Sequence, residues 1–315
     1  MSDQPIEWNE HDRPKAAGKR NLIPPRRDPP HEPLVDVLEG KRRNLSTYLW
    51  VRHKLTTSLL NEIERAGIEG VEIFCSGEHF DYRAPETVRE IADWFAGHRL
   101  KLHSLHGPTS RDFRPGREGG SPISLSDPEP MRRLDAVDEI KRALEVAEHA
   151  PFEIMVLHVA TARDEPGQRR WDAAFTSLEH LLLFARQRGV TLALENTPGE
   201  MATPANLRRF LEDTRLPGLR LCFDAGHAHM DTGALQGLET MRGLAVTSHL
   251  HDNHGEKDEH LLPFEGAIEW GRLMKAMPAN LPCVLELREQ TAQPLPSFDA
   301  IRAAFDKLER ARGNS

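Results

Sequence analysis

The densest group of side chains that could bind a metal or move protons lies in twelve residues in the last third of the chain. This stretch holds four histidines and four acids: His249, His251, His254, His260, Asp252, Glu256, Asp258 and Glu259. Strand side chains alternate between two faces, so His249 and His251 leave the same face if the apolar residues before them form a strand. An acidic, histidine-rich loop is also common on solvated surfaces. The stretch alone therefore leaves a metal site and a plain surface loop both open.

Other apolar runs of the chain end in the same residue types. Six more candidates close such runs or follow directly: His106, His158, Glu195, Asp224, His227 and Glu286. A lone histidine at a strand end is more often a satisfied polar group than a ligand, but a buried carboxylate is costly unless it is paired or binds metal. Three acids at one rim would repel each other without a cation between them. The pattern therefore indicates a divalent metal.

The elements that must position these residues alternate between strand-like and helical runs from residue 44 onward. Expected strands cover 44–51, 70–75, 101–106, 154–158, 190–195, 219–224, 245–251 and 283–287. Expected helices cover 58–66, 85–98, 129–149, 171–188, 203–213, 235–241, 268–277 and 297–311. Eight such units predict a single α/β domain at 44–315, a (β/α)8 TIM barrel whose strand ends converge at one mouth. A doubly wound sheet is the alternative, but no Gly-x-Gly-x-x-Gly follows a strand.

Composition limits the remaining function classes. Residues 1–43 are rich in proline and charge and predict an extended or disordered arm, or one that wraps a partner subunit, which leaves a homo-oligomer open. The net charge of −8 opposes broad nucleic-acid binding, although a local basic groove stays open. We expect no membrane span and no secretory signal. Three cysteines in apolar segments favour reduced thiols and a cytoplasmic location.

Four motifs carry a resemblance to a known family. The stretches 194–199 (LENTPG), 223–227 (FDAGH), 249–252 (HLHD) and 265–270 (EGAIEW) resemble the xylose isomerase-like TIM-barrel superfamily over about residues 45–310. In its sugar phosphate isomerase/epimerase branch, the resemblance implies one metal on Glu195, Asp224, His249 and Glu286. His249 is preferred to His251 because it lies three residues before Asp252.

The endonuclease IV branch of the same superfamily matches a larger set. Its multinuclear zinc site would use His106, His158, Glu195, Asp224, His227, His249, Asp258, His260 and Glu286. The Tyr-Leu pair with which that branch enters DNA is missing, since Gly107 and Pro108 follow His106. This departure weakens the prediction of a phosphodiesterase on abasic DNA.

The leading hypothesis is a metal-dependent isomerase or epimerase acting on a sugar, sugar phosphate or keto-polyol. The metal would polarise a carbonyl and stabilise an enediolate, while Glu195 and Glu286 remove and return the proton. Mixed oxygen and nitrogen ligands suit Mn²⁺, Zn²⁺ or Co²⁺, with Mg²⁺ or Fe²⁺ also compatible. Candidate groups for binding substrate hydroxyls are His106, His158, Glu200, His227, His251 and His260. The alternatives are a lyase or dehydratase on a keto-sugar, the abasic-DNA phosphodiesterase, and a catalytically silent binding barrel.

Overall fold

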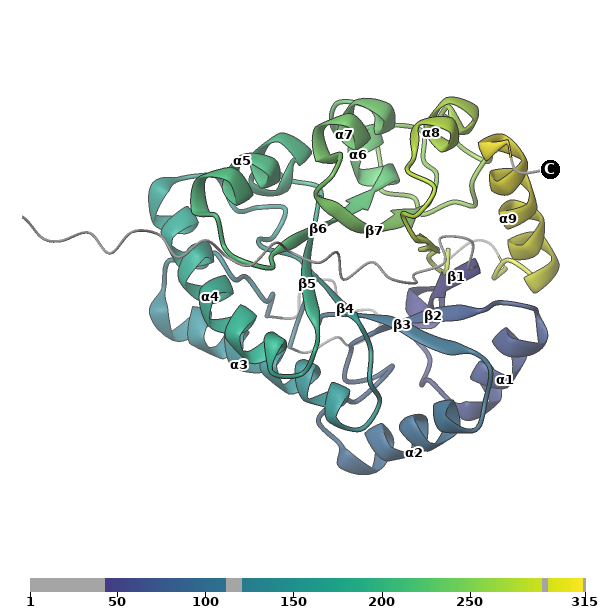
Figure 1. Ribbon diagram of the computed structural model, residues 1–315, viewed down its shortest axis with the longest axis horizontal. Helices are drawn as coiled ribbons and strands as arrows, with labels where there is room; N and C mark the ends of the chain where they lie inside the picture. The colour runs from purple at the N-terminus through teal and green to yellow at the C-terminus, as the bar shows by residue number, and fades with distance from the viewer. Residues whose placement is uncertain (1–42, 112–120, 291–293, 314–315) are drawn as a thin grey trace, which may run out of the picture. The chain divides into compact units, whose positions relative to one another are not determined.

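Eight parallel strands close into a barrel in the computed structural model, which describes residues 43–111, 121–290 and 294–313 (Figure 1). Each strand pairs with its neighbours in chain order, and β8 closes the barrel on β1. This confirms the predicted TIM barrel. The strands are β1 (Arg43–Ser46), β2 (Gly70–Phe74), β3 (Lys101–His106), β4 (Ile154–Leu157), β5 (Thr191–Glu195), β6 (Arg220–Asp224), β7 (Ala245–Leu250) and β8 (Cys283–Leu285).

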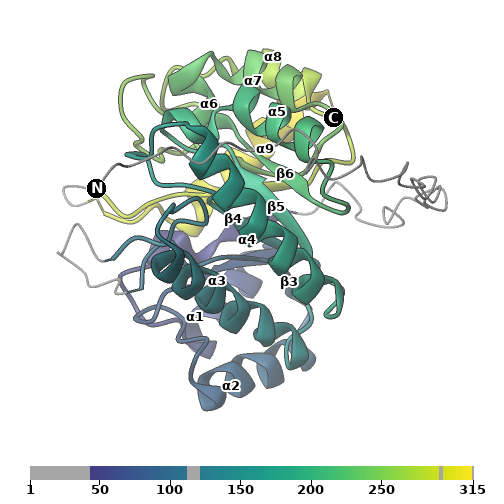
Figure 2. The same ribbon diagram turned by 90° about the vertical axis from the view of Figure 1, so that its left-hand side faces the viewer.

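Helices connect the strands and lie outside them in both views (Figures 1 and 2). The α-helices are α1 (Thr57–Arg65), α2 (Pro85–Ala96), α3 (Pro130–Leu144), α4 (Gln168–Arg186), α5 (Pro204–Thr214), α6 (Ala225–Asp231), α7 (Ala234–Met241), α8 (Trp270–Ala276) and α9 (Phe298–Arg312). Short 3-10 helices are η2 (Thr47–Trp50), η3 (Glu145–Glu148) and η4 (Glu200–Ala202). None of the described helices is long and apolar enough to cross a membrane.

Within a strand, every second residue faces the hydrophobic core beneath the helices, and the residues between them face the opposite side, where the candidate site lies. Leu192 and Leu194 of β5 pack in the hydrophobic layer beneath the helices, and so do Leu221 and Phe223 of β6. Residues of opposite parity, such as Cys222, belong to a small apolar cluster of their own. The last residue of each of these strands has that second parity, so the acids at 195 and 224 point away from the helix layer.

Several elements differ from the expected ones. The first strand ends at Ser46, whose side chain accepts a hydrogen bond from Tyr48 N–H and starts η2. Helix α6 was not expected, and it begins because the Asp224 side chain caps it. Helix α5 begins with a side-chain cap: Thr203 accepts from Asn206 N–H, and Pro204 lies in the first turn.

The expected boundary of the N-terminal arm falls almost entirely on undescribed residues. Of the range 1–43 only Arg43 is described, and it opens β1. Its guanidinium binds Asp306 at 2.6 Å and Glu309 at 2.8 Å on α9. The barrel therefore begins at Arg43, and the arm stays a prediction.

Candidate metal centre

Four strand ends bring Glu195, Asp224, His249 and Glu286 together in one buried group, the central group. The β6–β7 register pairs Asp224 with His249 directly. The Nδ1 atom of His249 lies 3.2 Å from Glu195 Oε1, 3.5 Å from Glu286 Oε2 and 3.8 Å from Asp224 Oδ2. One oxygen or nitrogen of each residue lies within 4.8 Å of the others. These four side chains can therefore reach a common ion.

The polar atoms that face each other in the central group have no hydrogen-bond partner among the described residues. They are Glu195 Oε1, Asp224 Oδ2 and His249 Nδ1, and all three are buried. Buried polar atoms without partners are costly, and a cation is the partner that three acids and an imidazole share. The second oxygen of Asp224 is in use, because it accepts from His227 N–H at 2.6 Å. The donor set fits a divalent metal.

A second group, the His106 group, shares Glu195 with the first. It consists of His106, His158 and Glu195. Both imidazole Nε2 atoms lie 3.1 Å from Glu195 Oε2, while Glu195 Oε1 faces His249. The other nitrogen of His106 lies 2.9 Å from the Gly107 carbonyl, to which it donates a hydrogen bond. Without a metal, Nε2 donates to Glu195 Oε2, and if an ion displaced that proton, the Nδ1 contact would leave the Nε2 lone pair toward the site. One carboxylate can thus bridge two ions.

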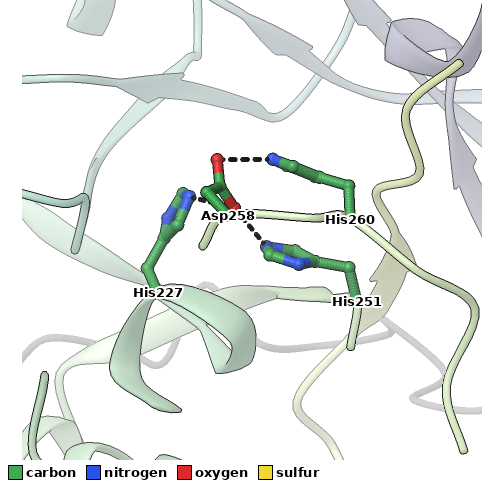
Figure 3. Close-up of side chains that lie close together, drawn as sticks. All are labelled: His227, His251, Asp258 and His260. Carbon is green, nitrogen blue, oxygen red and sulfur yellow. Dashed lines mark hydrogen bonds and ion pairs between the residues drawn. The ribbon is translucent and has the colours of Figure 1, made fainter. Parts of the chain in front are cut away.

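A third group, the His260 group, contains His227, His251, Asp258 and His260 (Figure 3). In the close-up the three imidazoles point toward the Asp258 carboxylate. Asp258 Oδ2 lies 3.0 Å from His260 Nε2, and Oδ1 lies 3.5 Å from His227 Nε2. His251 Nε2 lies 3.9 Å from Oδ1 and 3.1 Å from Asp224 Oδ1, which joins this group to the central one.

The loop after β7 is folded so that it presents Asp258 and His260. Asp252 carboxylate oxygens accept from the backbone N–H of Phe264 at 3.0 Å and of Ile268 at 3.1 Å, and from the indole of Trp270 at 2.7 Å. His260 has a positive φ of 50°, a conformation that non-glycine residues rarely adopt. Its Nδ1 is held 2.9 Å from the Glu286 carbonyl.

The charges of the site compensate each other. Burial alone would raise the pKa of Glu195, but the imidazoles of His249 and His158 hold that pKa well below its ordinary value. Burial opposes the charged form of His227 too, yet the Asp224 and Asp258 carboxylates raise its pKa well above the usual one. Without metal, the imidazoles therefore carry the positive charge that the acids need.

The site residues predicted from the sequence lie in the three donor groups, with the exception of Glu200. The four predicted metal ligands form the central group, and five predicted hydroxyl-binding histidines lie in the other two groups. Glu200 starts η4 with an exposed side chain and belongs to none of the three groups, so its role stays a prediction.

Two residues at the mouth were not singled out from the sequence. Arg288 donates a hydrogen bond to the backbone carbonyl of Asp258 and so holds the loop of the His260 group. The half-buried Tyr48 ring lies 5.3 Å from the His260 ring and 4.8 Å from the Phe74 ring. Arg288 lies two residues after Glu286, so strand alternation could have predicted that both side chains face the same side. Tyr48 follows β1 in η2, where strand alternation does not apply.

Comparison with known proteins places the fold in a family. A model of the xylose isomerase-like TIM barrel matches residues 60–311. The chain belongs to this family. The resemblance seen in the sequence is therefore confirmed.

Individual proteins are similar to this chain in sequence or in fold. The uncharacterized protein MJ1311 of Methanocaldococcus jannaschii is 25% identical over 243 residues, covering 74% of this chain and 78% of its own. A D-tagatose 3-epimerase-like protein superposes with a TM-score of 0.69 at 20% identity, covering 86% of this chain and 96% of its own. A Thermus thermophilus protein, TTHB071, soaked with ZnCl2, gives 0.62 at 22% identity, covering 87% and 98%. At these identities the solved structures support the fold alone.

Proposed function

We propose that the chain is a divalent-metal-dependent isomerase or epimerase of a sugar or keto-polyol. The observation that carries the proposal is the geometry of the central group, in which two glutamates, one ending β5 and one directly after β8, flank His249 Nδ1 at 3.2 and 3.5 Å. Its unpartnered buried atoms suit a cation, and an epimerase-like protein shares the fold. Mn²⁺, Zn²⁺ and Co²⁺ suit the mixed donors best.

Glu195, Asp224, His249 and Glu286 would hold the metal. When bound, a divalent ion supplies positive charge that polarises a carbonyl and stabilises an enediolate. The carboxylates of Glu195 and Glu286 remove a proton from the carbon next to the carbonyl and return it to the neighbouring carbon or the opposite face. Both lie on the barrel rim from different strands, so they reach a substrate from different sides.

The other side chains of the mouth bind and orient the substrate. His158 is the partly exposed member of its group, with 26% of its side chain accessible, so it is the imidazole best placed to contact a hydroxyl. Glu286 and His260 are almost buried at 4%, which keeps bulk water from the transferred proton. The same residues could carry the reaction on to loss of water, and a dehydrated product in the deuterium-exchange assay would identify a lyase.

A second candidate is favoured by the two flanking groups. A single-ion isomerase does not need the donors of the His106 and His260 groups, whereas several neighbouring ions stabilise the attacking and leaving oxygens of phosphodiester hydrolysis. Glu195 Oε2 facing two imidazoles while Oε1 faces His249 is the arrangement of a bridging ligand. The second candidate is therefore a multinuclear zinc phosphodiesterase of the endonuclease IV type.

The decisive experiment combines metal counting with two activity assays. For the isomerase we expect deuterium from solvent to enter members of a panel of keto-sugars and their phosphates, and Glu286→Gln to abolish that exchange. For the hydrolase we expect two or three ions per chain by elemental analysis and nicking of an abasic DNA duplex. Near-normal exchange in both Glu195→Gln and Glu286→Gln would reject the proton-transfer mechanism. Nicking without exchange would replace the first candidate with the second.

A further inference from the structure

Glu72 is a carboxylate inside the barrel that the proposed reaction does not use. It lies in the middle of β2 and is fully buried. Its neighbours Val71 and Ile73 pack in the hydrophobic layer beneath the helices, so Glu72 points to the other face. A carboxylate at this depth needs partners that repay its lost hydration.

Two side chains hold the Glu72 carboxylate. The Ser104 hydroxyl on β3 donates to Oε2 at 2.8 Å. The Nε2 atom of His249 lies 3.1 Å from Oε1 and 3.2 Å from Oε2. His249 itself has no solvent exposure, so these contacts are made without competing water.

The contact with Glu72 determines what the opposite nitrogen of His249 can do. The Nε2 atom makes a hydrogen bond with Glu72 Oε2, and because a carboxylate oxygen only accepts, Nε2 carries the hydrogen. Nδ1 makes no hydrogen bond with Glu195 or Glu286 despite its distance from them. In the neutral imidazole the hydrogen on Nε2 leaves the lone pair on Nδ1. Nδ1 is the atom that lies 3.2 Å from Glu195 and 3.5 Å from Glu286, buried and without a partner among the described residues.

We propose that Glu72 is a positioning residue that fixes the tautomer and ring orientation of His249, so that Nδ1 is presented to a divalent ion in the central group. The inference rests on the metal site of the proposed function, and not on which reaction that site performs. A carboxylate on the far nitrogen of a metal-binding histidine also makes the near nitrogen a stronger donor. Ser104 supports the arrangement by holding one oxygen of Glu72 in place.

The test measures metal affinity and needs no substrate. Zn²⁺ is titrated into the full chain against chelators of graded strength, for the wild type and for Glu72→Gln. We expect the variant to bind the ion of the central group about 10- to 100-fold more weakly, as is usual when a hydrogen-bond partner of a metal ligand is lost. Ser104→Ala should weaken binding in the same direction by a smaller factor, and it serves if Glu72→Gln does not fold.

The matched control is Glu139→Gln, which also removes the charge of a buried carboxylate. Glu139 is bound by Tyr82 and Arg83 on the other side of the sheet from the donor groups, so we expect its Zn²⁺ affinity to stay within about twofold of the wild type. A second readout is the ¹⁵N spectrum of the His249 ring in the zinc-loaded wild type, where the ring proton should sit on Nε2.

The outcomes distinguish a failure of the proposed role of Glu72 from a failure of the metal site. Wild-type affinity in a folded Glu72→Gln variant, or a His249 ring proton on Nδ1, overturns the role of Glu72 and leaves the metal site intact. A wild type that binds no Zn²⁺ overturns the metal site, and the role of Glu72 fails together with it.

Discussion

Replacing Glu195 with glutamine tests whether one carboxylate serves two metal positions. The substitution keeps the size of the side chain and removes its charge. The Oε2 atom faces His106 and His158 at 3.1 Å each, and Oε1 faces His249 at 3.2 Å. Without Glu195 the His106 group keeps two imidazoles, fewer than the three protein ligands of a usual zinc site. The central group keeps three donors.

The expected magnitude follows from these contacts. The interaction of a charged group with its partner is worth about 1.5–3 kcal/mol. At about 1.4 kcal/mol for each factor of ten, the central ion should bind roughly 10- to 100-fold more weakly in Glu195→Gln. Any ion of the His106 group should be lost altogether. Elemental analysis after gel filtration gives the ion count, and chelator competition gives the affinity.

The matched control is His158→Ala, which removes one donor from the His106 group and none from the central group. We expect it to lose only the ion of the His106 group. Equal ion content and affinity in Glu195→Gln and the wild type would refute the shared role. So would a loss in His158→Ala as large as that in Glu195→Gln.

Three further predictions concern other parts of the chain. Asp258→Asn removes the acid of the His260 group, so elemental analysis should find the ion of the central group retained and, if the wild type binds several ions, one ion fewer; loss of every ion would contradict separate groups. Thr203→Ala removes the cap of α5, which should cost about 1 kcal/mol and lower the melting temperature by about 2–4 °C, whereas an unchanged melting curve would show the cap to be dispensable. Burial lowers the pKa of His79 to about 4, so the unfolded chain takes up the proton first as the pH falls. His79 should therefore reduce the free energy of unfolding by about 3 kcal/mol between pH 6.5 and pH 4. Denaturant titrations of His79→Gln should show a flatter decline over this range, and an unchanged slope would exclude that contribution.

The barrel and the acids at its strand ends could be predicted from the sequence for the same physical reason, whereas the choice of His249 as the fourth ligand came from the family resemblance. Strand alternation determines the face of each residue, and parallel strands end at one rim, so Glu195 and Glu286 could be placed without coordinates. The last residue of each strand was harder to predict, because β1 ends at Ser46, whose side chain caps η2 from Thr47 onward.

The arrangement of the His260 group could not be derived in the same way. Asp258 and His260 lie on a loop whose shape depends on hydrogen bonds that the Asp252 carboxylate accepts from residues 12 to 18 positions later. Such contacts follow no short period. Glu200 is close in sequence to Glu195 but lies exposed on η4, outside the three donor groups, so nearness in sequence did not indicate its position.

Asp224 has two structural roles, and together they limit which substitutions the donor set of this barrel can tolerate. One oxygen initiates α6 by accepting from His227 N–H, and the other faces the central group. A longer glutamate would move both oxygens at once and detach the helix that carries His227. Ion preference can therefore be altered through His249 or Glu286 more readily than through Asp224, whose side chain length is tied to the start of a helix.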